Sequence, residues 1–193
     1  YLGVKNAIAV SNCTVGLEIA LRAIGVGPGD EVIVPDYTYP ATANAALIVG
    51  ASIKIVDVNA QTFNIDPVEI ENKISEKTKA VIAVSLFGNP VNYVQLDPLK
   101  DKFGFWVIED AACSLGSSFA AQKTGNIADI SVFSFHPRKF VTTGEGGVIT
   151  TNDDSLAEWM KSYKRFGMNL IQSGYDELFQ QVGTNYKLSD ILT

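Results

Sequence analysis

The stretch SVFSFHPRKFVTTGEGGVITT, residues 131–151, decides the fold, because it joins two strand-like runs through a polar turn. Its first five residues, Ser131–Phe135, are mostly apolar and predict a buried strand. Lys139 follows four residues later, and a Gly-Glu-Gly-Gly reversal at 144–147 precedes the second run, Val148–Thr151. A lysine therefore stands where a core strand ends, against a glycine-rich turn.

Short β-rich runs alternate with helical patterns along the rest of the chain. Most of these runs are continuously apolar, which is typical of strands buried on both faces. The predicted strands are Ala7–Val10, Glu31–Val34, Ser52–Val58, Ala80–Leu86, Phe105–Glu109, Ile130–Phe135 and Val148–Thr151. The predicted helices are Thr14–Ile24, Ala41–Val49, Pro67–Ile74, a short one ending over Leu99–Phe103, and Ser155–Arg165.

This alternation predicts an α/β fold with three layers, in which helices cover both faces of a mainly parallel central sheet. A length of 193 residues favours one domain, and 47% apolar residues suffice for a sizeable core. Neither a linker nor an internal repeat divides the sequence.

Composition excludes several classes of function. A formal net charge of −6 gives no electrostatic attraction for nucleic acid or for an anionic membrane. No apolar run approaches the roughly 18 residues of a membrane span, and no signal peptide is visible. Cys13 and Cys113 form neither a disulfide framework nor a metal-ligand pattern, so we expect a cytoplasmic protein.

Polar or aromatic residues follow two of the predicted strands at their carboxyl ends, where open α/β sheets bind ligands. Residues 11–14, Ser-Asn-Cys-Thr, begin a helix whose free N–H groups can bind a phosphate, although taken alone they are better explained as an ordinary N-cap by Ser11, Asn12 or Thr14. Tyr37 and Tyr39 follow the second strand and either stack on a flat ligand or pack within their loop.

Two further strand ends carry ionisable groups. Glu109 and Asp110 end an apolar strand, where a carboxylate is costly unless it has a partner such as a cationic ligand atom. Lys139 is either a solvated turn residue or, when neutral, a nucleophile that can form a Schiff base with a carbonyl group. A phosphate site, an aromatic ring, a carboxylate and a lysine together are the groups that pyridoxal phosphate requires.

Four segments in this order resemble the DegT/StrS-type sugar aminotransferases, which are pyridoxal phosphate enzymes of the aspartate-aminotransferase superfamily. The segments are GDEVIVPDYTYPATANA (29–45), VIEDAACSLGS (107–117), FSFHPRKFVTTGEGG (133–147) and GTNYKLSD (183–190). The resemblance implies that residues 1–193 form the cofactor-binding large domain, incomplete at its N-terminus and without the C-terminal small domain.

The resemblance also implies roles for individual residues. Lys139 corresponds to the lysine that holds the cofactor as a Schiff base and moves protons, and Asp110 to the aspartate that meets the pyridine nitrogen. Tyr39 corresponds to the aromatic residue that stacks on the ring. Phosphate binding is implied for Thr14, Val15 and Ser134, contact with the ring hydroxyl for Cys113, and contact with a neighbouring subunit's phosphate for Asn185. That last contact implies a homodimer with shared active sites.

Two positions depart from the common family pattern. Cys13 stands where a glycine is usual, and Cys113 stands where a longer polar side chain contacts the cofactor, although a thiol is a weak hydrogen-bond partner. We expect the only histidine, His136, to shape the turn before Lys139 rather than to catalyse.

The implied reaction converts a nucleotide-linked keto sugar to an amino sugar, with glutamate as amino donor and Lys139 as general acid and base. A sugar dehydratase is one alternative, although a histidine replaces the lysine in relatives of that kind. A non-catalytic or truncated relative that acts as a sensor or scaffold is another. A nucleotide-binding oxidoreductase is disfavoured, because residues 11–16 lack the glycine fingerprint.

Overall fold

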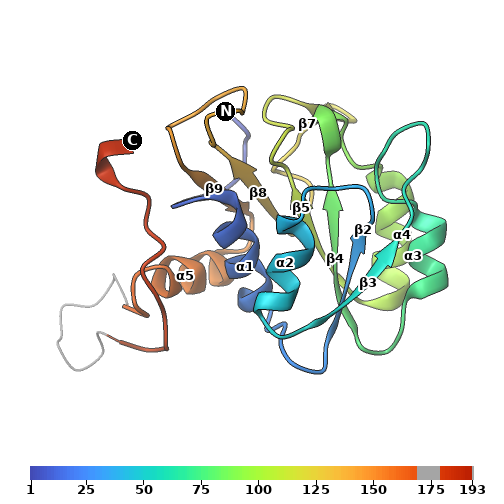
Figure 1. Cartoon of the computed structure of the whole chain (residues 1–193), viewed down its shortest axis with the longest axis horizontal. Coiled ribbons are helices and arrows are strands. Elements are labelled where there is room, and N and C mark those ends of the chain that lie inside the picture. The colour runs from blue at the N-terminus through green and yellow to red at the C-terminus, as the bar shows by residue number, and fades with distance from the viewer. Residues whose placement is uncertain (169–178, 193) are drawn as a thin grey trace.

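A seven-stranded sheet forms the centre of the computed structural model, which describes residues 1–168 and 179–192 (Figure 1). The spatial order is β1-β9-β8-β5-β4-β2-β3, and only β9 runs antiparallel to its neighbours. The expected mainly parallel sheet is therefore confirmed. Its strands are β1 (Asn6–Val10), β2 (Glu31–Pro35), β3 (Ser52–Val56), β4 (Thr78–Val84), β5 (Trp106–Asp110), β8 (Ile130–Ser134) and β9 (Gly147–Thr151).

Five α-helices and three smaller elements complete the described part of the chain. The helices are α1 (Cys13–Ala23), α2 (Ala41–Ile48), α3 (Pro67–Lys73), α4 (Tyr93–Phe103) and α5 (Asp154–Tyr163). The smaller elements are a hairpin of β6 (Ser118–Phe119) and β7 (Gln122–Lys123), and the 3-10 turns η1 (Leu86–Gly88) and η3 (Asp190–Leu192). The predicted ends lie within two residues of the observed ones, but α4 is longer than the short helix expected to end over Leu99–Phe103, and the hairpin was not predicted.

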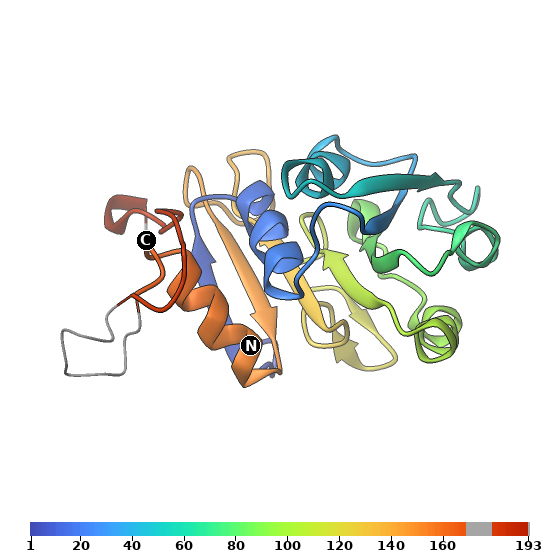
Figure 2. The same ribbon diagram turned by 90° about the horizontal axis from the view of Figure 1, so that it is seen from below.

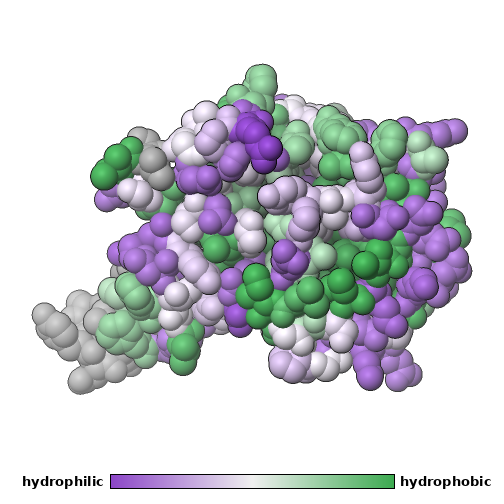
Figure 3. Space-filling model, in the orientation of Figure 1, coloured by the Kyte–Doolittle hydropathy of each residue, from purple (hydrophilic) through white to green (hydrophobic). Residues whose placement is uncertain are grey.

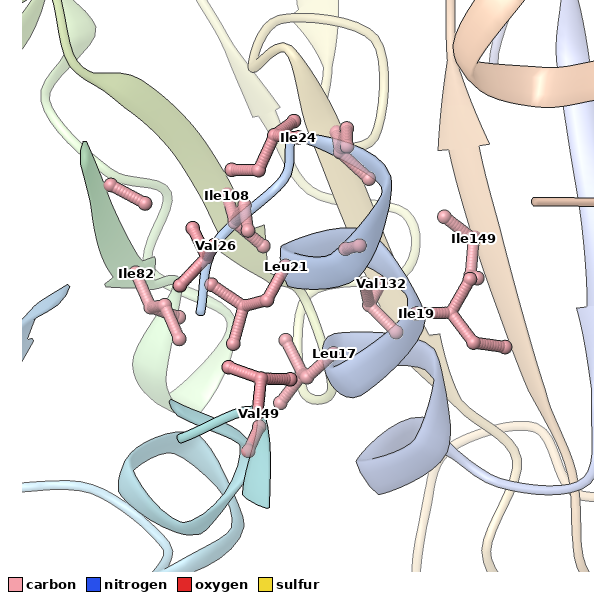
Figure 4. Packing of buried hydrophobic residues seen from close by; sticks show 14 of the residues in the cluster. Leu17, Ile19, Leu21, Ile24, Val26, Val49, Ile82, Ile108, Val132 and Ile149 are labelled. Carbon is pink, nitrogen blue, oxygen red and sulfur yellow. The ribbon is translucent and has the colours of Figure 1, made fainter. Parts of the chain in front are cut away.

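Helices cover both faces of the sheet, as the alternating pattern predicts (Figure 2). On one face α1, α2 and α5 bury apolar side chains against the sheet, where Leu17 and Leu21 of α1 pack with Ile82 and Ile108 (Figure 4). On the other face α3 and α4 bury a second cluster that includes Leu96. Each fully buried side chain of this size contributes about 1.5–3 kcal/mol, so the two clusters hold the three layers together.

The strand register brings distant segments to one edge of the sheet. Val10 at the end of β1 and Ser134 at the end of β8 both pair with Gly147, the first residue of β9. Asp110 at the end of β5 pairs with Val132 on β8. The carboxyl ends of β1, β5 and β8 therefore lie side by side, although they are far apart in the sequence.

Gly147 explains part of the glycine-rich reversal. A Cβ atom at this position would lie 2.7 Å from the carbonyl carbon of Asn12 and 2.8 Å from the backbone nitrogen of Cys13. Only glycine allows β9 to begin so close to the backbone at the start of α1. The reversal that follows Lys139 therefore packs directly against the start of α1, which the sequence suggests as a phosphate site.

The outer side of α2 and the neighbouring β3 expose apolar side chains, as Figure 3 shows. Leu47, Ile48 and Ile55 each expose about half of their surface, whereas Ala45 and Ala46 on the inner side of α2 are fully buried. The helix therefore contacts the core mainly through small residues, which allow close packing. Within the described residues, no helix has both the length and the apolar character needed to cross a bilayer.

Candidate active site

A cavity of about 680 Å³ lies at the edge of the sheet where β1, β5 and β8 end. This volume is in the range of roughly 300–1,000 Å³ that is typical of small-molecule sites. Seven of the eight residues selected from the sequence line it: Thr14, Val15, Tyr39, Asp110, Cys113, Ser134 and Lys139. The fold therefore brings residues from four separate chain segments around one space.

Lys139 reaches the cavity from a tight turn that follows β8. Its backbone N–H donates to the carbonyl of His136 over 2.9 Å, and Pro137 occupies the second turn position, where its fixed φ is favoured. The N–H of Arg138 donates to Nδ1 of His136 over 3.2 Å. The histidine ring thus braces the turn, in agreement with the expectation that it supports Lys139.

Asp110 is the buried acid of the cavity, with 5% of its surface exposed. Its Oδ2 accepts a hydrogen bond from Oγ1 of Thr42 over 2.8 Å, and its Oδ1 accepts one from the N–H of Ala112 over 3.2 Å. Burial raises the pKa of the Asp110 carboxyl, while these two hydrogen bonds and the charge of Lys139 oppose the rise. The carboxylate is therefore held in place but lacks a full counter-charge.

Glu109, the neighbouring acid, belongs to the opposite face of the sheet because side chains alternate along a strand. It is fully buried and accepts hydrogen bonds from Ser85 Oγ at 2.5 Å, Ser131 Oγ at 2.9 Å and the N–H of Gly125 at 3.0 Å. Of the two acids that the sequence placed at this strand end, only Asp110 lines the cavity.

The start of α1 offers backbone donors to the cavity. Asn12 caps the helix, since its Oδ1 accepts from the N–H of Val15 over 3.0 Å. Among the described residues, the N–H groups of Cys13 and Thr14 donate to no protein acceptor. Two free N–H groups at the positive end of the helix dipole form a suitable place for a phosphate.

The two cysteines that depart from the family pattern both line the cavity. Burial raises the pKa of the Cys13 thiol well above its usual value, so this thiol stays protonated. Cys113 is exposed, and its Sγ lies 3.2 Å from the Nζ atom of Lys139. Cys113 is thus the cavity side chain that holds the lysine amine in this structure.

The structure separates the two tyrosines that follow β2. Tyr39, 69% exposed, stands at the cavity, where its ring is free to cover a ligand. Tyr37 instead joins an aromatic cluster, with its ring centre 5.6 Å from that of Phe63 and 6.4 Å from that of Phe87.

Asn185 is the selected residue that does not line the cavity. It is exposed in the segment 179–192, where its backbone bridges Arg165. Sequence reasoning also missed Thr42, whose hydroxyl contacts Asp110. Thr42 could have been found as the only threonine of an alanine-rich helix. If it faces the core, its hydroxyl requires a hydrogen-bond partner there.

Two other cavities accompany the main one. One of about 250 Å³ adjoins it, shares Cys113, Ser134 and Lys139 with it, and has apolar walls that include Phe87 and Phe140. Another of about 570 Å³ lies beside the starts of α3 and α4 and contains none of the selected residues. Among the described residues, no group of three or more acidic, histidine or cysteine side chains is arranged to hold a metal.

The donor set of the main cavity fits pyridoxal phosphate. Lys139 supplies an amine for the aldehyde, Asp110 a buried carboxylate for a protonated ring nitrogen, and Tyr39 an aromatic ring for the face of the pyridine. The start of α1 supplies N–H donors for the phosphate. A carboxylate that is buried with only neutral hydrogen-bond donors and one amine suits a cationic ligand atom.

Comparison with known proteins gives one consistent family. The sequence matches the DegT/DnrJ/EryC1/StrS aminotransferase family over residues 1–193. It is 43% identical to the GDP-perosamine synthase of Caulobacter vibrioides over 99% of this chain and 51% of that protein. It is 41% identical to a UDP-2-acetamido-2-deoxy-3-oxo-D-glucuronate aminotransferase of Pseudomonas aeruginosa over 88% of this chain and 47% of that protein.

A solved structure supports the same relationship. The structure of ntda from Bacillus subtilis, with its bound cofactor PMP, matches with a TM-score of 0.90 and 33% sequence identity. The match covers 100% of this chain and 43% of that one. The chain spans about half the length of the curated relatives it matches.

Proposed function

The chain belongs to the DegT/DnrJ/EryC1/StrS aminotransferase family, and from this premise we propose that residues 1–193 form the pyridoxal phosphate-binding domain of a sugar aminotransferase. The proposed reaction converts a nucleotide-linked keto sugar to an amino sugar. The named activities of the Caulobacter and Pseudomonas relatives support this substrate class. The observation that carries the proposal is that Lys139 and Asp110 line the same cavity.

Lys139 is the proposed catalytic residue. Its Nζ would hold the cofactor, and as a free amine it would take a proton from the amino donor and later return one to the product. When bound, pyridoxal phosphate supplies an electron sink for the carbon that loses its proton. The turn that His136 braces fixes where this amine can reach.

Asp110 is proposed to keep the ring nitrogen protonated by charge rather than by proton transfer. Its fixed position, set by Thr42 and Ala112, aligns the carboxylate before the cofactor binds. Tyr39 is proposed to cover one face of the ring, and Cys113 to approach its hydroxyl group in place of the longer side chain usual in the family.

The phosphate is proposed to bind at the start of α1. The free N–H groups of Cys13 and Thr14, the Thr14 hydroxyl and the Ser134 hydroxyl supply its donors. Val15 joins them only when Asn12 releases its N–H group, because that N–H is already capped.

We further propose that glutamate is the amino donor and that two copies share their sites, with Asn185 reaching the phosphate of the partner. The exposure of Asn185 and its absence from the cavity of its own chain support this arrangement. The two free thiols support a reducing, cytoplasmic setting.

An optical experiment tests the proposal. The protein loaded with pyridoxal phosphate should absorb visible light, and glutamate should discharge that absorbance as the amino group is transferred. Lys139→Arg should abolish the glutamate response, whereas Lys77→Arg, at an exposed site away from the cavity, should retain it. A protein that takes up no cofactor would instead support a scaffold, and one that binds cofactor without responding to any amino donor would contradict amino transfer.

A further inference from the structure

We propose that Thr42 is a positioning residue, which orients the Asp110 carboxylate and keeps it charged for a cationic ligand atom through a two-hydroxyl relay that begins at Thr38. The inference rests on the proposed function for the identity of that ligand atom. The relay itself is a property of the protein alone, and it is therefore open to measurement without the cofactor.

The hydrogen-bond geometry fixes the direction of the relay. Oγ1 of Thr42 donates to Oδ2 of Asp110 over 2.8 Å, and Oγ1 of Thr38 lies 2.9 Å from Oγ1 of Thr42. A hydroxyl has one proton, and that of Thr42 is already given to Asp110. Thr38 must therefore donate to Thr42, and a chain of donors in one direction polarises each bond toward the carboxylate.

The local sequence explains why α2 can perform this task. Thr42 lies in the first turn of α2, on the buried side that also carries Ala45 and Ala46, and none of its surface is exposed. Figure 1 shows α2 beside the end of β5. A buried hydroxyl without a partner is costly, so the acceptor on β5, 68 residues further along the chain, is part of what holds the helix in place.

Thr42 is one of three groups that favour the charged form of Asp110. Burial raises the pKa of this carboxyl, and the hydrogen bond from Thr42 is the largest effect that lowers it, followed by the Ala112 N–H and then by the charge of Lys139. The other titratable or charged groups around the cavity are Cys13, Tyr39, Cys113, His136, Arg138 and Glu145. Removing the Thr42 hydroxyl should therefore shift Asp110 toward its neutral form.

The first measurement uses the cofactor-free protein. The Asp110 carboxyl is titrated by carbon-13 NMR of aspartate-labelled protein, with its signal assigned by Asp110→Asn. We expect the pKa of Asp110 to rise in Thr42→Val and to stay near the wild-type value in Thr42→Ser, which keeps the hydroxyl. Thr38→Val should produce a smaller rise, because Thr42 then still donates but is no longer polarised.

The second measurement is pyridoxal phosphate affinity. Because a hydrogen bond to a charged group is among the stronger ones, losing it in Thr42→Val should weaken pyridoxal phosphate binding roughly tenfold or more. Thr42→Ser keeps the hydroxyl, so its affinity should change little. Circular dichroism verifies folding, and Thr42→Ala replaces Thr42→Val if the valine variant does not fold.

The two outcomes separate the inference from the proposed function. If the wild-type protein binds no pyridoxal phosphate, the proposed function fails, but the titration still decides whether Thr42 controls Asp110. An unchanged Asp110 titration in folded Thr42→Val and Thr42→Ala would overturn the inference even in a protein that binds the cofactor. A raised pKa in Thr42→Ser equal to that in Thr42→Val would also overturn it, because the effect would not depend on the hydroxyl.

Discussion

At the scale of single residues, burial destabilises the charged form of Asp110, and the interactions within the folded chain do not fully offset this destabilisation. It is almost fully buried, and its partners are one hydroxyl, one backbone N–H and the charge of Lys139. Sites that bind cationic groups commonly hold a carboxylate in such a state, at some expense of stability. This arrangement has a consequence for the stability of the cofactor-free protein.

Asp110→Asn is expected to stabilise the cofactor-free protein relative to wild type, and more so as pH rises. Because burial raises the pKa of Asp110, the folded state binds its proton more tightly than the unfolded chain does. The free energy of unfolding of the wild type therefore falls as pH increases from about 4 through the raised pKa. Because asparagine does not titrate, the free energy of unfolding of Asp110→Asn does not fall in this way.

Thermal unfolding from about pH 4 to pH 8 measures the effect. Asp101→Asn, at an exposed position, is the matched control and should follow the wild type throughout. A difference between Asp110→Asn and wild type that does not change with pH would show that Asp110 is not destabilised by burial.

Much of the site is readable from residue types, and part of it is not. Lys139, Asp110, Tyr39 and the start of α1 were predictable, because each follows a strong strand pattern. Thr42 was not, because its acceptor lies 68 residues away and only the packing of α2 on β5 reveals the pair.

At the scale of elements, the site depends on the close approach of β9 to the start of α1. Gly147→Ala is expected to weaken pyridoxal phosphate binding, because a Cβ atom would meet the backbone of Asn12 and Cys13 at 2.7–2.9 Å and displace the proposed phosphate donors. Overpacking of this kind typically costs about 1–3 kcal/mol of stability. Calorimetry and cofactor titration measure the two effects.

Gly27→Ala is the matched control for this substitution. Gly27 has no positive φ, and its nearest neighbour, the carbonyl oxygen of Val49, lies 4.0 Å from where the Cβ atom would be. The control should bind the cofactor like wild type. Equal binding by Gly147→Ala and Gly27→Ala would mean that the approach of β9 does not position the phosphate site.

The elements themselves were largely predictable, because continuous apolar runs mark strands buried on both faces. The first turns of α4 were missed, since Pro98 interrupts the helical pattern. The β6–β7 hairpin has only two residues per strand, which is too short for a periodic signal. The antiparallel direction of β9 depends on pairing with both β1 and β8 and is not encoded in its own residues.

At the scale of the whole molecule, the proposed role of Asn185 requires a site that two copies complete. We predict that Lys139→Ala and Asn185→Ala, each strongly impaired alone, complement one another when the two proteins are mixed after unfolding and refolding. Random pairing makes half of the dimers hybrid, and each hybrid keeps one intact site, so roughly a quarter of wild-type activity should return. Transamination assays measure the recovery, and the Lys139→Ala variant refolded alone is the control.

If hybrid dimers form but activity does not return, Asn185 does not contribute to the site of the partner subunit, and the proposed sharing is wrong.

The sequence could suggest this arrangement only through family resemblance, because contacts between copies leave no periodic pattern within one chain. The exposed position of Asn185 is compatible with a role across an interface.

The most direct test of the central claim is to map where pyridoxal phosphate attaches. The loaded protein is reduced with borohydride, digested and analysed by mass spectrometry, beside Asp110→Ala treated in the same way. We predict one labelled residue, Lys139, with labelling strongly diminished in Asp110→Ala because ring and amine share one cavity. Label on lysines outside the cavity, or labelling of Lys139 that is indifferent to Asp110, would contradict the account.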